Sequence, residues 1–310
     1  MMIMTDTIYD VAVIGAGPAG MTAALYCGRA NMSTILFGNI FDSQLAKAGS
    51  VENYPGFDSI QGIELVEKFH SQLGRYNVMQ VPALISRVTH EGDTFTLVTE
   101  NGEFKTNSII LATGSRYRQL NIPGEKEFSY KGVSYCAVCD GSFYKGKTVA
   151  LLGHGDQAAK SAIYLAGLCR EVIILSPKPE RESVTYAEQL DAMPNIQIVL
   201  SSKVLAIEGD QYVERLRYTV KNGPEQVLKV DGVFIEGGTP NSVLAKEIGL
   251  DVDEKGNVAV DRPDMHTKID GVFAAGDVTG GIHQISKAVG EGACAAVSAA
   301  LYIKKKKSKK

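Results

Sequence analysis

Tryptophan is absent from this chain of 310 residues, so no indole emission would mask a fluorescent ligand. No apolar run approaches the roughly 18 residues that a membrane-spanning helix needs. The first residues lack the basic and apolar regions of a secretory signal peptide. Cysteine is scarce, and five cysteines with one closely spaced pair do not form a secreted disulfide framework. We therefore expect a cytoplasmic protein without a membrane partner.

Positive charge is in deficit over most of the chain. The formal net charge is −3, from 32 Lys and Arg against 35 Asp and Glu. Residues 304–310 carry six of the lysines, which leaves 26 basic against 35 acidic residues elsewhere, a balance of −9. Such an acidic body would repel phosphates, so a nucleic-acid partner is not expected. We expect residues 304–310 to form a basic, disordered tail that would help to dock an acidic protein partner.

The length suggests about two domains, and a glycine motif marks the first. The apolar run from Ile8 to Ile14 predicts a buried parallel strand, 21–30 a helix and 33–37 the next strand. Between the first strand and the helix lies Gly15-Ala16-Gly17-Pro18-Ala19-Gly20, a spacing typical of dinucleotide-binding folds. Gly15 would permit the tight turn, Gly17 the approach of a pyrophosphate, and Gly20 the packing of helix on strand.

A second unit repeats this plan from Thr148. A strand to Leu152 is followed by the glycine turn of residues 153–158, a helix to about 168 and a strand over 172–175. Antiparallel strands are predicted over 84–110 in the first unit, and near 204–208 and 212–221 in the second. The fold class that we expect is therefore α/β, with two Rossmann-like three-layer domains.

Two further strands end in small-residue turns. One runs into Ala112-Thr113-Gly114, and the other, over 271–275, runs into Gly276-Asp277. Glycine permits close approach and aspartate accepts hydroxyl protons, which suits the sugar chain of a cofactor, although an ordinary strand-end turn is the alternative. A helix over about 284–303 is predicted to follow.

Cys136-Ala137-Val138-Cys139 has a spacing used both by zinc sites and by redox dithiols. Zinc needs about four ligands; there is no second such pair and the five histidines are scattered, so no metal site is expected. The two sulfurs can close a small disulfide ring, and Asp140 beside them could exchange protons with a thiol. Two inert buried cysteines are the alternative. Cys27, Cys169 and Cys294 are expected to be buried and structural.

Together these residues resemble the low-molecular-weight thioredoxin reductases, over about residues 8–302. The most specific feature is the Cys-x-x-Cys-Asp sequence placed just before the second glycine motif. The resemblance is carried by Gly15–Gly20, Gln44-Leu45, Glu52-Asn53-Tyr54-Pro55-Gly56, Ala112-Thr113-Gly114, Cys136–Asp140, Gly153–Ala158 and Ala274-Ala275-Gly276-Asp277-Val278.

The resemblance implies a fold like that of the class II pyridine nucleotide-disulfide oxidoreductases. Residues 1–117 and 246–310 would form a discontinuous FAD domain, and residues 118–245 an inserted NAD(P)H-type domain carrying the dithiol. Cys136 would attack the substrate disulfide, Cys139 would lie beside the flavin, and Asp140 would be the acid–base residue. Homodimers are usual in the family.

The resemblance also implies the FAD contacts. Asp277 would bind the ribityl or phosphate region. Gln284 and Ile285 would face the pyrimidine edge of the flavin, where a helix dipole favours the anionic reduced form. His283 stands where the family usually has Arg, and Gln44 lacks the usual preceding Gly-Gly. The predicted FAD residues are Gly15, Gly17, Pro18, Ala19, Gly20, Gln44, Asn53, Thr113, Gly114, Gly276, Asp277, His283, Gln284 and Ile285.

The NADPH clamp of the family, His-Arg-Arg with a further Arg four residues on, is not kept. The chain has Ser176-Pro177-Lys178 at this point, and Arg181 is one position away from the last Arg. A dianionic 2′-phosphate is best bound by paired guanidiniums, so one lysine beside Glu180 is a poor substitute. NADH is not favoured either, because no acidic residue closes the strand at Leu175 or Ser176. A residual nucleotide site would consist of Gly153, Gly155, Lys178 and Arg181.

The leading hypothesis is a flavin-dependent disulfide reductase, a thioredoxin reductase-like oxidoreductase. Electrons would pass from FAD through Cys136 and Cys139 to a protein disulfide, in the first place thioredoxin. The donor would be ferredoxin or a reduced deazaflavin, as in relatives with degraded clamps. Alternatives are a conventional NADPH enzyme acting through Lys178 and Arg181, an FAD-dependent dithiol oxidase that uses oxygen, and a non-enzymatic flavin-binding redox sensor.

Overall fold

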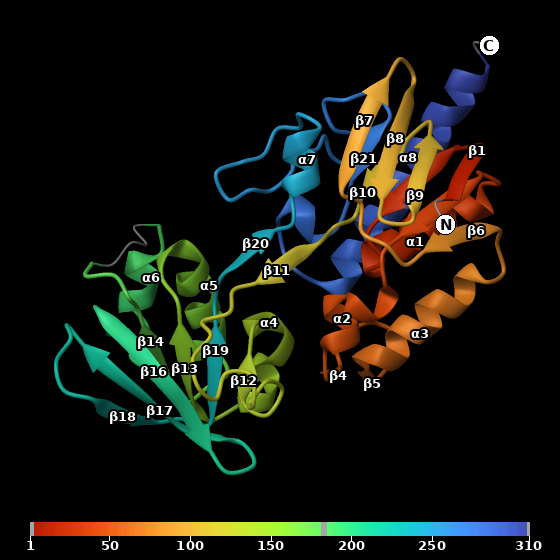
Figure 1. The fold of residues 1–310 in the computed structure, drawn as a ribbon. Helices are drawn as coiled ribbons and strands as arrows, with labels where there is room; N and C mark the ends of the chain where they lie inside the picture. Colours follow the sequence, from red (N-terminus) through yellow and green to blue (C-terminus); the bar gives the residue numbers. More distant parts are fainter. Residues whose placement is uncertain (1–2, 181–184, 309–310) are drawn as a thin grey trace. The chain divides into compact units, whose positions relative to one another are not determined.

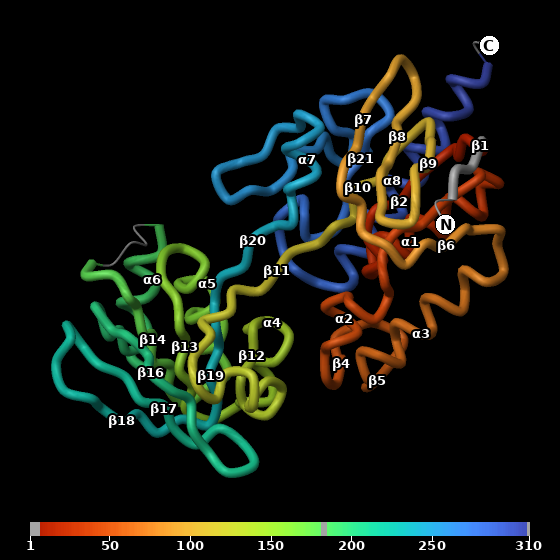
Figure 2. The backbone as a smooth tube through the Cα atoms, in the orientation of Figure 1, coloured from red at the N-terminus to blue at the C-terminus, as the bar shows by residue number. Residues whose placement is uncertain are grey.

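The computed structural model describes residues 3–180 and 185–308, which divide into two compact units. One unit comprises the chain up to Arg116 and from Thr239 onward, and the other comprises Tyr117–Gly238. The chain passes between them in β11 (Ser115–Tyr117) and β20 (Gly238–Pro240), which pair as a two-stranded sheet (Figure 2).

The return crossing lies before residue 239, whereas the sequence places it after residue 245. Helix α7 (Val243–Glu247) follows the crossing at once. Ala245 is 2% exposed and packs in one apolar cluster with Phe104 and Leu250 of the first unit. Burial of this side chain therefore assigns residues 239–245 to the first unit.

The first unit has a central parallel sheet with strand order β21-β10-β2-β3-β6 (Figure 1). Val11 and Val13 pack into one apolar cluster with the helices, whereas Ala12 and Ile14 pack into another with the antiparallel strands. Successive side chains of a strand point to opposite faces of its sheet, so this alternation is that of a strand buried on both faces. The central strands are β2 (Val11–Ile14), β3 (Thr34–Phe37), β6 (Val78–Val81), β10 (Ile109–Leu111) and β21 (Val272–Ala274).

Helices cover one face of this sheet and a second sheet of order β1-β9-β8-β7 covers the other. The helices are α1 (Pro18–Arg29), α3 (Gly62–Leu73) and α8 (Ile285–Lys307). The strands of the second sheet are β1 (Ile3–Tyr9), β7 (Arg87–Glu91), β8 (Thr94–Thr99) and β9 (Gly102–Thr106).

The second unit repeats this three-layer plan. Its parallel sheet has the order β12-β19-β13-β14-β15. Val149 and Leu151 pack with helix α5 (Gly155–Ala166), and Ala150 and Leu152 pack with the antiparallel sheet on the opposite face. The strands are β12 (Val133–Ser134), β13 (Thr148–Leu152), β14 (Glu171–Leu175), β15 (Ile196–Val199) and β19 (Gly232–Ile235), with β16 (Ser202–Gly209), β17 (Val213–Val220) and β18 (Gln226–Lys229) in the antiparallel sheet. The predicted α/β class with two Rossmann-like three-layer domains is confirmed.

The prediction of one strand over residues 8–14 is wrong. The chain forms β1 and β2, which belong to different sheets, and Ile8 is 48% exposed. Asp10 separates the two strands, and its carboxylate accepts a hydrogen bond from the backbone N–H of Ser33 at 3.1 Å. The buried, hydrogen-bonded Asp10 therefore separates β1 from β2.

The prediction of a disordered tail is wrong for residues 304–307, which form the last turn of α8. Nζ of Lys307 lies 2.8 Å from Oδ1 of Asp10, which ties this turn to the start of β2. Lysines also interact favourably with the negative end of a helix dipole. Residues 309–310 lie outside the described residues. In the part of the chain that is described, every helix is too short or too polar to traverse a bilayer.

Candidate functional site

The first glycine turn is packed tightly everywhere except at Gly17. Gly15 has φ of 111°, and a Cβ there would lie 2.1 Å from the carbonyl oxygen of Ala112. A Cβ on Gly20 would lie 1.7 Å from the carbonyl oxygen of Gly15. A Cβ on Gly17 would meet nothing within 4 Å. The turn therefore leaves open space at the one glycine that the sequence assigns to a pyrophosphate.

The start of α1 offers backbone donors to this open space. Gly17 is the N-cap of α1 and makes no side-chain capping hydrogen bond, and Pro18 occupies the first turn. The first N–H groups of a helix have no partner within the helix, and they attract anions. The start of α1 therefore suits a phosphate group.

Gln44, Ser115 and Asp277 form a hydrogen-bonded chain across the first unit. Nε2 of Gln44, at the start of α2 (Gln44–Lys47), donates to Oγ of Ser115 at 3.0 Å. Oγ of Ser115 donates to Oδ2 of Asp277 at 3.2 Å. Two of these residues are predicted FAD contacts. Ser115 was not predicted, and no motif points to it because its two partners lie 71 and 162 residues away.

The other predicted FAD residues of this unit lie at neighbouring loop ends. Nδ2 of Asn53 donates to Oε1 of Gln284 at 3.1 Å, just before α8. Thr113 donates to the carbonyl oxygen of Asn241 at 2.6 Å, and a Cβ on Gly114 would meet nothing within 4 Å. Ile285 begins α8 and is half-buried, whereas His283 is exposed.

Gly276 brings the loop of Asp277 into contact with α1. A Cβ on Gly276 would lie 2.9 Å from Cβ of Ala19, so only glycine leaves the two backbones this close. A Cβ on Gly292 of α8 would lie 2.3 Å from the carbonyl oxygen of Ala19. Helices α1 and α8 thus pack almost backbone to backbone, and Ala19 and Gly276 meet at their contact.

These features fit FAD. The open positions at Gly17 and Gly114 and the uncapped start of α1 suit a dinucleotide phosphate backbone. The carboxylate of Asp277, which is partly exposed, suits sugar or ribityl hydroxyls. Gln284 and Ile285 at the start of α8 suit the polar edge of an isoalloxazine ring.

The dithiol lies in the second unit, at the end of edge strand β12. Cys136 and Cys139 form a disulfide, and Cys136 precedes the short helix α4 (Ala137–Asp140). The backbone N–H of Cys139 lies 3.1 Å from Sγ of Cys136. Both cysteines are partly exposed, and Val138 between them is 48% exposed. The segment that carries the disulfide is therefore partly exposed.

Asp140 is a partly buried carboxyl group next to this disulfide. Burial raises the pKa of Asp140 above its usual range, and a hydrogen bond from Ser134 opposes that rise. Oγ of Ser134 lies 2.6 Å from Oδ2 of Asp140. A carboxyl group with a raised pKa takes up and releases protons closer to neutral pH, which suits a proton carrier for thiols.

The three other cysteines differ from one another. Cys27 and Cys169 are buried, and burial raises the pKa of Cys27 to about 12 and that of Cys169 to about 11. These two thiols stay protonated and inert at neutral pH. The prediction that Cys294 is buried is wrong, because it lies on the outer face of α8.

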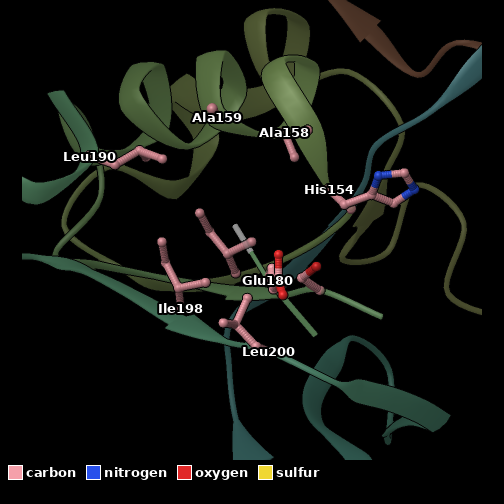
Figure 3. A pocket seen from close by; sticks show the side chains of 11 residues that line it. His154, Ala158, Ala159, Glu180, Leu190, Ile198 and Leu200 are labelled. Atoms are coloured by element: carbon pink, nitrogen blue, oxygen red, sulfur yellow. The ribbon is translucent and has the colours of Figure 1, made fainter. Parts of the chain in front are cut away.

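The second glycine turn borders a small, open pocket in the second unit (Figure 3). Gly153 and Gly155 line it, as do Ser176 at the end of β14 and Glu180. Gly153 packs against the end of β19, where its Cβ would lie 2.9 Å from Cβ of Glu236. Aliphatic side chains complete the pocket, including Leu190, Ile198 and Leu200.

The described lining of this pocket holds little positive charge. Of the described residues that line it, none is Lys or Arg, and Glu180 is the acidic one. Lys178 is exposed and lies outside the lining, although its backbone N–H bonds to Oγ of Ser176 at 3.2 Å. Arg181, the other predicted contact, lies outside the described residues. A carboxylate in this lining would repel a phosphate dianion.

Within residues 3–180 and 185–308, no three His, Cys, Asp or Glu side chains are grouped so that they could hold a metal ion.

Comparisons with known proteins agree on one family. A family model described as pyridine nucleotide-disulphide oxidoreductase matches residues 9–292. The thioredoxin reductase of Bacillus subtilis is 37% identical over 306 residues, which cover 96% of each chain. The structure of thioredoxin reductase from Streptococcus pyogenes has a TM-score of 0.91 at 34% identity, covering 97% of this chain and 100% of that one. A ferredoxin-flavin thioredoxin reductase from Clostridium acetobutylicum has a TM-score of 0.55 at 35% identity, covering 97% and 99%.

Proposed function

The chain belongs to the pyridine nucleotide-disulphide oxidoreductase family, and on that premise we propose that it reduces the disulfide of a thioredoxin-type protein. It is a disulfide oxidoreductase with FAD as its cofactor. In this proposal Cys136 and Cys139 would carry electrons from the bound cofactor to the substrate disulfide. The observation that carries the proposal is an accessible disulfide with the carboxyl group of Asp140 beside it.

The exchange with substrate balances within the two disulfides. The thiolate of Cys136 attacks one substrate sulfur, which breaks the substrate S–S bond and forms a mixed disulfide. The other substrate sulfur leaves in that step. Cys139 then attacks Sγ of Cys136, which restores the intramolecular disulfide and releases the substrate sulfur that Cys136 had attacked. Two electrons and two protons move from the dithiol to the substrate, and Asp140 carries a proton between the sulfurs.

FAD, when bound, supplies the two electrons that open the Cys136–Cys139 disulfide. The residues proposed to hold it are those of the first unit described above. Gly17 and the start of α1 receive the pyrophosphate, Asp277 the sugar or ribityl hydroxyls, and Gln284 with Ile285 the edge of the ring. Gln44 and Ser115 orient Asp277 through their hydrogen bonds.

The proposed donor is not NADPH but ferredoxin or a reduced deazaflavin. The pocket of the second unit supports this, because Glu180 occupies it and Lys178 does not. The Clostridium acetobutylicum relative, 35% identical, is named as a ferredoxin-flavin enzyme. A conventional NADPH enzyme with a weak clamp is the alternative.

The lysine run at the end of α8 does not support a docking site for this donor. Lys304 lies 19 residues after Ile285, which is about 28 Å along the helix axis. A donor bound to the lysines would therefore be far from the flavin edge proposed at the start of α8.

The donor is identified by anaerobic bleaching of the flavin absorbance of the purified protein. NADPH, NADH, reduced ferredoxin and reduced deazaflavin are added in separate cuvettes. Bleaching by ferredoxin or deazaflavin and by neither nicotinamide supports the proposal. Fast bleaching by NADPH overturns the donor and leaves a conventional reductase. Bleaching by a small dithiol alone, with oxygen consumption in air, overturns the direction of electron flow in favour of a dithiol oxidase.

The substrate and the assembly are tested separately. Protein reduced at its flavin should convert oxidised thioredoxin to the dithiol form, and Cys136→Ser should abolish the conversion. Sedimentation of the holoprotein tests the homodimer that the family resemblance implies.

A further inference from the structure

Ser134 lies between the dithiol and its acid–base group. It ends strand β12 and is 4% exposed. Its Oγ accepts a hydrogen bond from the backbone N–H of Cys136 at 3.1 Å. The same Oγ donates to Oδ2 of Asp140 at 2.6 Å. One hydroxyl group therefore touches both the backbone of the attacking cysteine and the carboxyl group that moves its proton.

The hydroxyl group can serve both protonation states of Asp140. A serine hydroxyl has one proton to donate and can accept two. When Asp140 is ionised it is an acceptor only, and the Ser134 proton points to it. When Asp140 is protonated it donates to Oγ, and the Ser134 proton can turn to the carbonyl oxygen of Cys136 at 3.4 Å. Proton transfer therefore leaves neither oxygen without a partner.

Few other groups act on Asp140. Of the described groups, Tyr130 and Tyr144 interact with it electrostatically. Burial raises the pKa of Tyr130 and raises that of Tyr144 to about 12, so both phenols are neutral at neutral pH. Tyr144 in turn faces Cys169 and Asp231, and Nζ of Lys147 lies 5.6 Å from the centroid of its ring. Burial thus favours protonated Asp140, and the Ser134 hydroxyl is the group that favours the carboxylate.

We infer that Ser134 is a positioning residue, which governs the pH range over which Asp140 exchanges protons with the dithiol. This inference rests on the proposed function, because it assigns Asp140 its role there. Removing the hydroxyl group leaves the carboxylate buried without its donor. The proton uptake of Asp140 then moves to higher pH, while the two sulfurs stay where they are.

The test is single-turnover exchange with a small aromatic disulfide, followed over a range of pH. The full holoprotein is first reduced with dithionite, so neither the natural donor nor thioredoxin is needed. The variants are Ser134→Ala and Ser134→Thr, and the matched control is Ser142→Ala, an exposed serine just after α4. Ser134→Ala loses a hydrogen-bond donor to a charged group. The part of the rate-against-pH profile that reports the titration of Asp140 should therefore move up by about one pH unit in this variant. Ser134→Thr and Ser142→Ala should keep the parent profile.

Superimposed profiles for Ser134→Ala and the parent protein overturn the inference, and so does an equal shift in Ser142→Ala. If Ser134→Ala does not fold, Ser134→Thr and Ser134→Val form a second pair of similar volume, of which only the valine variant should shift. The proposed function fails separately. It fails if the parent dithiol does not exchange at any pH, or if Cys136→Ser exchanges as fast as the parent.

Discussion

Lys287 and Glu291, one turn apart on α8, form an ion pair with Nζ and Oε2 3.0 Å apart and about one-tenth of each side chain exposed. Nζ of Lys287 also donates to the carbonyl oxygens of Gly276 at 2.8 Å and Gly280 at 2.5 Å. Glu291 accepts the N–H of Gly276 at 2.9 Å. The ion pair and its hydrogen bonds therefore hold the loop of Asp277 against α8, the helix that follows Gln284.

Replacing Lys287 by Met should weaken FAD binding and lower stability. The buried carboxylate of Glu291 then loses its more buried cation and keeps the half-exposed Arg262, whose Nη1 lies 3.2 Å from Oε1, so the cost should be up to about 3 kcal/mol. FAD release is followed by flavin fluorescence, which no tryptophan obscures, and unfolding by heat. Lys305→Met, on the exposed end of the same helix, is the control and should change neither. In the double variant Lys287→Met/Glu291→Met the loss should be smaller than in Lys287→Met alone, because the buried carboxylate is removed together with its buried cation and the half-exposed Arg262 stays solvated.

Gly17→Ala and Gly20→Ala should separate ligand binding from folding. A methyl group on Gly17 meets open space, and its φ of −80° suits alanine, so the apoprotein should be unchanged or up to about 1 kcal/mol more stable. FAD affinity should fall about tenfold or more, because the methyl group enters the space assigned to the pyrophosphate. Gly20→Ala should destabilise the apoprotein itself. Equal unfolding midpoints for the two apo variants would contradict this geometry.

Asp140→Asn should stabilise the protein at neutral pH and not in acid. The pKa of Asp140 is raised in the folded state by burial, so its contribution to stability is full below the pKa of the unfolded chain. That contribution is lost as the pH rises through the folded value. Asparagine does not titrate, so its contribution to stability does not change with pH in this way. Denaturant unfolding at pH 4 and pH 7 checks the sign, and a gain of the same size at both pH values would speak against a raised pKa.

Glu180→Arg should create affinity for NADPH. It replaces the acidic group in the lining of the second pocket with a guanidinium, which binds phosphate well. We expect the NADPH concentration for half-maximal binding, measured by calorimetry, to fall about tenfold or more. Glu127→Arg has the same charge change at an exposed site of the same unit and should have no effect. If both variants gain equally, net charge and not the pocket is responsible.

The chemistry-bearing motifs could be predicted because each depends on neighbours in the chain. The turn at Gly15 and Gly20 is a fixed sequence between a strand and a helix, and the close approach of Gly20 to the carbonyl oxygen of Gly15 follows from that spacing. The disulfide between Cys136 and Cys139 needs only two intervening residues. The α/β class followed from apolar runs that alternate with helical segments.

Other sequence predictions depended on surroundings that the chain does not display locally. The apolar run at Ile8 continues into β2 by composition, yet Asp10 anchored to Ser33 divides it between two sheets. The lysines at 304–307 look like a solvated tail, yet α8 continues through them and Lys307 pairs with Asp10. Cys294 lies among small residues but faces outward, because Ala295 and Ala296 take the buried side of the helix.

Local chain order thus determined the Cys136–Cys139 disulfide and the first glycine turn of this protein, because turns and short rings close over a few residues. Tertiary structure decided which polar groups assist them. Ser115 meets Gln44 and Asp277 only because the fold brings the start of α2 and the segments after β10 and β21 together. Ser134 meets Asp140 only because α4 follows β12 closely. The sequence alone does not show which serines have such a role. A serine hydroxyl group forms hydrogen bonds with whichever polar groups the fold places within about 3 Å.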